Sequence, residues 1–284
     1  MEREFDNMNE IVKYHNNLNS VNLRKWTSEE MNFFFTIIAK VRDNGTKLVL
    51  FNSDELKELA GFANEHTDRW IDVMESVSRK VIDLKYFEKT ESKFIAMNLF
   101  SYFEVNSANK TVEVEVASKF EYVVNKLEAQ FTRYELEEFT NIRSTYAKTM
   151  YRFLKQWRTL GKKEYKVDEL RQMLDVPDSY SSGEVTRRVI EPIKKELKKY
   201  FGDFKCKVVK SNKRGNPVSS YEFTWKPEKS GQWIENKYDK ESMQSNVPTW
   251  SQPNYKASTS QKDLEELEKR KRQALDRLRK SKEE

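Results

Sequence analysis

The stretch Glu184–Tyr200, EVTRRVIEPIKKELKKY, decides how the second half of this chain folds. Its apolar residues recur at the spacing of a helix and can face a core, whereas Thr186 and the adjacent Arg187 and Arg188 point away from that face. Pro192 fits the first turn of a second helical piece, because the N–H that proline lacks has no helical partner there. The stretch therefore predicts two helical pieces joined at a kink. The core-facing residues are Val185, Val189, Ile190 and Ile193.

The elements around this stretch follow the order of a winged helix. Residues 144–161 predict a helix that Ser144 opens, and a short strand over 164–167 leads into a short helix over 168–176. Residues 205–226 then predict a β-hairpin. A helix-turn-helix followed by such a hairpin, the wing, is a winged helix, which places its second helix in a DNA groove. The turn of the wing carries Lys213, Arg214, Gly215 and Pro217.

The first half of the chain repeats this order. Thr27 and Glu30 have the spacing of a capping box, and Ser53 has the position of a helix N-cap. The stretch SDELKELAG also returns as VDELRQMLD 114 residues later, which indicates an internal duplication. The predicted elements are helices over 27–42, 53–61 and 66–84, a strand over 48–51, and a hairpin of residues 94–105 and 111–118 around a turn at 106–110.

The last part of the chain differs in composition. Residues 227–261 are rich in Ser, Gln, Asn and Pro, which is typical of a flexible linker. The charged end carries a narrow stripe of Leu264, Leu267, Leu275 and Leu278, typical either of a solvated helix that folds in part or of a helix that docks on a host protein or another copy. We predict an α+β chain with two tandem winged helices. Its parts are a polar lead (1–9), an amino-terminal domain (10–135), a carboxy-terminal domain (136–226), a disordered linker (227–261) and a charged helix (262–284).

Basic residues are concentrated in one segment. The whole chain has 52 Lys and Arg against 46 Asp and Glu, a net charge of +6. Residues 1–140 have 18 basic and 25 acidic side chains, net −7, whereas residues 141–226 have 21 and 10, net +11. A Lys- and Arg-rich helix alone is usually a solvated face. Net charge, element order and a basic wing on the same domain together favour double-stranded DNA as its partner.

The composition indicates no metal, cofactor or membrane partner. The single cysteine, Cys206, excludes an internal disulfide and a cysteine-based zinc site, and it fits a reducing compartment. His15 and His66 lie 51 residues apart without a partner motif, unlike the paired histidines that hold the metal of a nicking enzyme. No apolar run approaches the length of a membrane span, and the acidic start does not have the pattern of a signal peptide. We expect a protein of the bacterial cytoplasm.

We expect no catalytic residue. A nucleoside triphosphatase needs a glycine-rich loop that ends in Gly-Lys-Ser/Thr, and none of the seven glycines lies in that pattern. Asp168 and Glu169 are adjacent carboxylates, but Asp168 has the position of a helix N-cap. Cys206 lies on an alternating strand, as a core or rim residue does. The sequence therefore predicts a binding protein and not an enzyme.

The candidate DNA contacts lie on the reading helix, on the helical piece after it and on the wing. Arginine can reach O6 and N7 of guanine in the major groove, and lysines can follow the phosphates. Lys199 and Lys205 extend this basic surface. The candidates are Arg143, Ser144, Ser181, Ser182, Thr186, Arg187, Arg188, Lys194, Lys195, Lys198, Lys207, Lys210, Lys213 and Arg214.

Three motifs carry a family resemblance. STYAKTMYRFLKQWRTLGK, VDELRQMLDVPDSY and VTRRVIEPIKKEL, in this order, resemble the plasmid replication initiator (Rep) proteins that bind iterons and start theta-type replication. The resemblance covers residues 9–226. It implies two winged helices, of which the carboxy-terminal one reads origin repeats through Ser181–Ile190. The amino-terminal one contacts adjacent DNA in the monomer and mediates dimerisation. Its secondary contacts would be His66, Thr67, Arg69 and Trp70.

The sequence thus favours a non-catalytic origin binder. Monomers would bind direct repeats side by side, help to open A/T-rich DNA and recruit host replication initiation or helicase-loading proteins. The resemblance implies that dimers repress the protein's own gene. Two alternatives stay open. One is a dimeric transcriptional regulator on an inverted repeat, and the other is a protein scaffold whose DNA binding is incidental.

Overall fold

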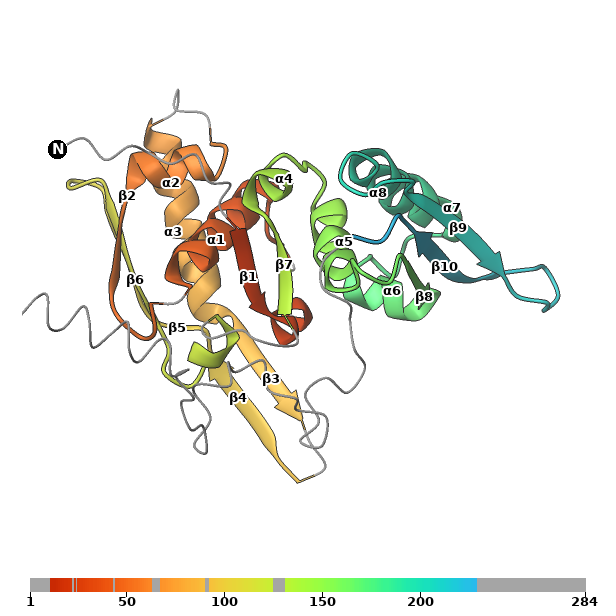
Figure 1. Ribbon diagram of the computed structural model, residues 1–284, viewed down its shortest axis with the longest axis horizontal. Helices are drawn as coiled ribbons and strands as arrows, with labels where there is room; N and C mark the ends of the chain where they lie inside the picture. Colours follow the sequence, from red (N-terminus) through yellow and green to blue (C-terminus); the bar gives the residue numbers. More distant parts are fainter. Residues whose placement is uncertain are drawn as a thin grey trace, which may run out of the picture. The chain divides into compact units, whose positions relative to one another are not determined.

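The computed structural model describes residues 11–21, 23, 25–42, 44–62, 67–89, 92–124 and 131–228. All of them belong to one compact unit that spans Met1–Gln232 (Figure 1). The predicted polar lead, the charged terminal helix and the linker beyond residue 228 lie outside the described residues. The described part contains two winged helices, so the predicted α+β class is confirmed.

The amino-terminal winged helix begins with α1 (Ser28–Val41). The Thr27 backbone N–H donates to the Glu30 carboxylate at 2.7 Å, and the Glu30 N–H donates to the Thr27 hydroxyl at 3.2 Å. This is the predicted capping box, which satisfies two N–H groups that the helix itself leaves unpaired. The helix is anchored by buried residues that include Phe33, Phe34, Phe35, Ile37 and Ile38.

Three strands form the sheet of this domain in the order β2-β6-β5. β2 (Val49–Asn52) pairs antiparallel with β6 (Thr111–Val116), which pairs in turn with β5 (Phe100–Asn106). The β5–β6 hairpin is the predicted wing. Along β6 every second residue is buried, so one face of the sheet covers the core.

The helix-turn-helix of this domain consists of α2 (Ser53–Leu59) and α3 (Thr67–Asp83). Asn52 caps α2, because the Asp54 N–H donates to Asn52 Oδ1 at 2.8 Å. The predicted cap at Ser53 is wrong. Asn52 has the extended backbone that an N-cap requires, which makes Ser53 the first helical residue.

A second hairpin, whose first strand was not predicted, follows α3. β3 (Lys85–Lys89) pairs antiparallel with β4 (Phe94–Asn98). The predicted continuous run over 94–105 is therefore divided at Leu99, a buried residue. Its first part pairs with β3 and its second part pairs with β6, so one predicted strand belongs to two sheets.

Segments from the two ends of the first half lie side by side. β1 (Ile11–His15) pairs antiparallel with β7 (Phe131–Glu135). The short helices η1 (Asn16–Ser20) and α4 (Leu136–Thr140) follow these two strands, and η2 (Glu121–Val123) precedes β7. This long-range pair closes the first domain next to the start of the second (Figure 1).

The carboxy-terminal winged helix repeats the first one's sheet topology. Its order, β8-β10-β9, matches β2-β6-β5 strand by strand, which supports the predicted duplication. Ser144 opens α5 as predicted, because the Ala147 N–H donates to the Ser144 hydroxyl at 3.3 Å. The elements are α5 (Thr145–Gln156), β8 (Lys162–Lys166), α6 (Val167–Met173), α7 (Ser182–Val185), a π-helical turn η3 (Thr186–Ile190), α8 (Glu191–Leu197), β9 (Lys205–Lys210) and β10 (Val218–Thr224).

Several predicted helix boundaries differ from the structure by a few residues, including the ends of α2 at Leu59 and of α6 at Met173. α5 ends at Gln156 and not at residue 161. The chain then turns to Gly161, whose φ of +72° favours glycine and where a Cβ would lie 2.8 Å from the Trp225 carbonyl oxygen. Asp168 is not the N-cap of α6, because Lys166 has that position. The Asp168 carboxylate lies in the first turn, where the helix dipole favours negative charge.

Residues 227 and 228, the first two of the predicted linker, belong to the described part of the chain. The Glu228 N–H donates to the Arg158 carbonyl at 3.0 Å, and the Glu228 carboxylate lies 2.6 Å from Lys155 Nζ. These contacts hold Glu228 against the second domain, and they join residues that are distant in the sequence.

Candidate DNA interface

The reading helix is built as the sequence predicts. Ser181 caps α7, since the Glu184 N–H donates to the Ser181 hydroxyl at 3.3 Å and the Ser181 N–H donates to the Glu184 carboxylate at 3.0 Å. The Thr186 hydroxyl donates to the Ser182 carbonyl at 3.0 Å. The four residues predicted to face the core, Val185, Val189, Ile190 and Ile193, are all buried.

The two helical pieces join in a widened turn. η3 spans Thr186–Ile190, and α8 starts at Glu191 with Pro192 in its first turn. In a regular α-helix the ring of Pro192 would clash with the Arg188 carbonyl, and proline donates no N–H. A π-helical turn next to a proline is a common way to relieve both problems. The predicted interruption is thus a local widening within a continuous helical path.

The two adjacent arginines have different surroundings. Arg188 Nη1 donates to the Tyr180 hydroxyl at 3.4 Å, its guanidinium carbon lies 5.1 Å from the Tyr180 ring centroid, and Nη2 lies 3.6 Å from the Glu184 carboxylate. The Arg187 side chain is exposed and makes no hydrogen bond or ion pair with any residue that the structure describes. Arg188 is therefore held in place, whereas Arg187 offers its complete set of N–H donors to a ligand.

Further basic residues follow the arginine pair on α8 and on the wing. Lys195, Lys198 and Lys199 are exposed, whereas Lys194 is half-buried and lies 2.9 Å from the Glu191 carboxylate. Lys207 faces Glu222 across the β9–β10 pair. The wing hairpin ends in an extended loop (Figure 1). Its exposed basic residues are Lys205, Lys207, Lys210, Lys213 and Arg214.

Arg143 and Ser144 lie where α5 begins. The backbone N–H groups of both residues donate to the Glu196 carboxylate, at 2.6 Å from Arg143 and at 3.2 Å and 3.3 Å from Ser144. This contact ties α5 to α8. The Arg143 side chain is exposed, and the Ser144 hydroxyl serves as the helix cap.

Three cations of α5 lie inside the protein. Lys148, Arg152 and Lys155 are all buried, and they lie on the side of the helix that contacts the first domain and the chain end. Lys148 Nζ donates to Asn32 Oδ1 and to the Phe139 carbonyl, both at 2.5 Å. Burial lowers the pKa of Lys148 to about 7. The net charge of +11 for residues 141–226 therefore overstates the charge available to DNA.

The candidate contacts of the first domain are fewer than predicted. Arg69 forms an ion pair with Glu29 and lies 5.3 Å from the Phe62 ring centroid. Thr67 begins α3, but its side chain and all of His66 lie outside the described residues. Trp70 is only 2 % exposed, so the predicted contact of Trp70 with DNA is wrong. Trp70 is adjacent to Arg69 in sequence, but its helical spacing places its side chain in the core.

Two features of the described residues bear on metal binding and on cysteine chemistry. Within them, no group of three or more His, Cys, Asp or Glu side chains is placed to hold a metal ion. Burial raises the pKa of the Cys206 thiol to about 12, so the thiolate, its reactive form, is scarce. In the part of the chain that the structure covers, no helix has the length and apolar character needed to span a bilayer.

Comparison with known families assigns both domains. Residues 11–155 match the family model "Initiator Replication protein, WH1", and residues 166–225 match "Initiator Rep protein, WH2". A curated relative from Bifidobacterium longum (strain NCC 2705), "Probable replication protein rep", is 36 % identical over 191 residues. That match covers 66 % of this chain and 64 % of the relative, a little under two thirds of the relative's length.

A solved structure shares the fold. The Pi initiator protein, crystallised in complex with iteron DNA, superposes with a TM-score of 0.63 at 14 % identity. The similarity covers 79 % of this chain and the whole of that chain. Because the two winged-helix models together match most of the described residues in the expected order, the chain belongs to the family of initiator replication (Rep) proteins.

Proposed function

We propose that this protein starts plasmid replication by binding direct repeats, or iterons, at the origin through its carboxy-terminal winged helix. The observation that carries the proposal is the exposed Arg187 beside the tethered Arg188, on a helix whose opposite face is buried in the core. The Pi initiator, which shares this fold, was crystallised on iteron DNA. The protein acts by binding and not by catalysis.

The two arginines would divide the work of recognition. Arg187 has all its donors free for a base edge or a phosphate, and an arginine that forms two hydrogen bonds to guanine discriminates against a wrong base by about 1–3 kcal/mol. Tyr180 and Glu184 hold Arg188, so less side-chain freedom is lost when it binds. Lys195, Lys198 and the wing would add phosphate contacts that fix the register without reading sequence.

The amino-terminal domain would provide self-association. β2 lies at the edge of its sheet; Leu50 within it is 62 % exposed, and Leu48 directly before it is 53 % exposed. Exposed apolar residues on an edge strand suit pairing with a second chain. We therefore propose that dimers form through this domain and repress the protein's own gene. Monomers occupy the repeats, help to open A/T-rich DNA and recruit host replication initiation or helicase-loading proteins in the bacterial cytoplasm.

A double substitution tests the DNA interface. Arg187→Ala with Arg188→Ala should abolish specific binding to a duplex of direct repeats, measured by fluorescence anisotropy, while the circular dichroism spectrum stays unchanged. Lys47→Ala with Lys119→Ala removes the same charge from exposed sites of the first domain and should leave specific binding nearly intact. If the arginine variant binds the repeats as tightly as the wild-type protein does, the assignment is wrong.

A further inference from the structure

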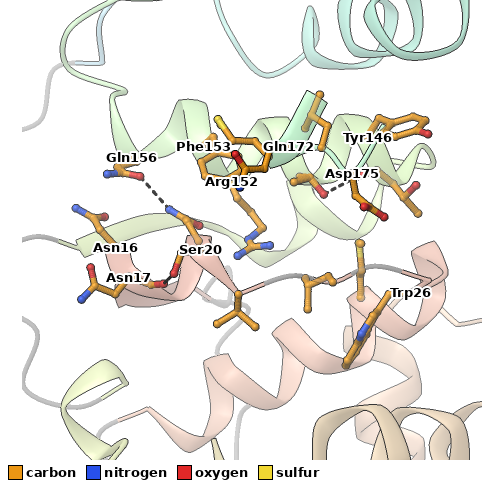
Figure 2. A pocket seen from close by; sticks show the side chains of 18 of the residues that line it. Asn16, Asn17, Ser20, Trp26, Tyr146, Arg152, Phe153, Gln156, Gln172 and Asp175 are labelled. Carbon is orange, nitrogen blue, oxygen red and sulfur yellow. Dashed lines mark hydrogen bonds between the residues drawn. The ribbon is translucent and has the colours of Figure 1, made fainter. Parts of the chain in front are cut away.

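A cleft of about 730 Å³ lies where the start of the chain meets α5 and the end of α6 (Figure 2). Its size is within the range of small-molecule sites. η1 and the segment that leads into α1 form one wall, and one face of α5 forms another. Much of the lining is uncharged and polar, with amide or hydroxyl groups from Asn16, Asn17, Ser20, Thr149, Gln156 and Gln172.

A buried guanidinium lies at this cleft. Arg152 is only 2 % exposed, and it belongs to the residues that line the cleft. Its Nε donates to the Tyr14 hydroxyl and its Nη2 donates to the Leu18 carbonyl, each at 3.0 Å. The guanidinium carbon also lies 4.5 Å from the Phe35 ring centroid. These contacts hold the side chain, but none of these groups is an anion.

The positive charge of Arg152 is not neutralised within the described chain. Arg152 forms no ion pair with a described carboxylate, and its Nη1 makes no hydrogen bond there. A buried charge without a counter-charge is costly unless a ligand supplies one. Lys25 adds a second cation to the lining, against one carboxylate, Asp175. The lining is therefore net positive and suits an anion.

Aromatic side chains give the cleft a second feature. Trp26, Tyr146 and Phe153 contribute rings to its lining, and Figure 2 shows Trp26 and Tyr146 toward the same end. Rings of this kind accept a planar heterocycle by stacking, because every base has a π-face. An anion, a flat ring and several hydrogen-bonding groups are the combination that a nucleotide presents.

The cleft is connected to the reading helix through Tyr146 and Tyr180, although no residue of that helix lines it. Tyr146 belongs to its lining, and the pKa of Tyr146 is raised, first by burial and then by the neighbouring Tyr180. Tyr180 accepts the hydrogen bond from Arg188 at 3.4 Å. Side chains in contact thus lead from the cleft through Tyr180 to one of the two candidate DNA-reading arginines.

We propose that this cleft is an effector site for a nucleotide, with the phosphate at Arg152 and the base against the half-buried rings of Tyr146 and Phe153, and that occupancy changes affinity for DNA. The effect on DNA affinity rests on the proposed function. Nucleotide binding does not, because it is measured without DNA.

Calorimetric titration of the full-length protein with ADP tests the site, with adenosine and inorganic phosphate as partial ligands. ADP should bind at least about 10-fold more tightly than adenosine, since a hydrogen bond to a charged group contributes about 1.5–3 kcal/mol. ADP should also bind more tightly than inorganic phosphate, which lacks the ring. The site is refuted if ADP does not bind, if adenosine equals ADP, or if inorganic phosphate equals ADP.

A variant in which a larger side chain fills the cleft tests the location of the ADP site. Thr149→Phe places a ring in the cleft and should abolish ADP binding with little change in the thermal unfolding midpoint. Leu160→Phe adds a ring at an exposed position outside the lining and should bind ADP as the wild-type protein does. If Thr149→Phe binds ADP normally, the cleft is not the binding site.

The regulatory half needs a DNA measurement. Saturating ADP should change the affinity of the wild-type protein for repeat DNA by about fivefold or more, the lower end of ordinary coupling. Thr149→Phe should bind the repeats but show no response to ADP. If ADP binds and the wild-type affinity for repeats does not change, the coupling through Tyr180 is refuted. If no repeat is bound at all, the proposed function fails and the calorimetric result stands.

Discussion

Replacing Lys148 by methionine should change how the stability of this protein depends on pH. Lys148 is fully buried on α5, and its Nζ donates to two neutral oxygens, Asn32 Oδ1 and the Phe139 carbonyl. A neutral amine has two N–H groups, one for each oxygen, so the uncharged form fits this site. Glu196 opposes the effect of burial, but the pKa remains at about 7 instead of 10.5.

The direction in which stability changes with pH follows from proton binding. Between pH 7 and 10.5 the unfolded chain holds the Lys148 proton and the folded chain does not, so the free energy of unfolding rises with pH in this window. The cost of a charged Lys148 is complete below the lower pKa and absent above the higher one. At about 1.4 kcal/mol per unit, the whole effect is about 5 kcal/mol.

Urea unfolding of the wild-type protein and of Lys148→Met, followed by tryptophan fluorescence from about pH 6 to 10, measures this difference. The stability of the wild-type protein relative to the variant should rise by up to about 1.4 kcal/mol per pH unit. The variant also leaves the buried Asn32 Oδ1 without a donor, which subtracts about 1–3 kcal/mol at every pH, whereas the Phe139 carbonyl still accepts from the Ile142 N–H. Lys195→Met removes an exposed lysine as a control. A difference between wild type and Lys148→Met that stays constant with pH would refute the reasoning.

Three further outcomes follow from the geometry. Arg187→Ala should weaken binding to the repeats by about 1–3 kcal/mol and relax specificity at one base position, which competition with mutated repeats would show. Lys195→Ala should instead weaken binding to all DNA sequences alike and reduce the slope of log affinity against log salt by about 1. Tyr180→Phe removes the hydroxyl that Arg188 contacts, so affinity for the repeats should fall about fivefold, corresponding to roughly 1 kcal/mol for one hydrogen bond, with an unchanged melting temperature. Gly161→Ala should lower the unfolding free energy by more than about 1 kcal/mol, because φ is +72° and a backbone oxygen lies 2.8 Å from the new Cβ; equal stability in urea would contradict this.

Local chemistry made much of this fold predictable. The capping box at Thr27, the cap at Ser144 and the core face of the reading helix each depend on residues within a few positions of one another. The two wings could be predicted for the same reason, since a hairpin joins neighbours in sequence. Because the same order of elements recurs, the fold predicted for one half of the chain also applies to the other half.

Long-range contacts were not predictable in this way. β1 and β7 are short and lie far apart in the chain, so neither shows a pattern that identifies its partner. β3 was missed because Lys85–Lys89 is charged and lies directly after a long helix. The cap of α2 was misplaced by one residue, since asparagine and serine are both good caps and only the backbone selects between them.

In the candidate site, too, local features were predictable and contacts between separate elements were not. The exposed arginine pair follows from helical spacing, but the tether of Arg188 through Tyr180 and Glu184 is only half visible, because Glu184 is four residues away and Tyr180 precedes the helix. The spacing of Lys148, Arg152 and Lys155 places all three on one helix face with buried neighbours. This spacing could have indicated that the three cations are buried, whereas a count of charged residues treats them as exposed.

Footprinting of the purified protein on the DNA around its own gene, titrated with salt, tests whether the carboxy-terminal domain reads origin repeats. We expect protection of several evenly spaced direct repeats, with log affinity falling against log salt by about 0.9 for each phosphate neutralised. A single protected palindrome would indicate a dimeric regulator instead. The absence of any footprint at low salt would contradict the assignment of the carboxy-terminal domain as the DNA reader.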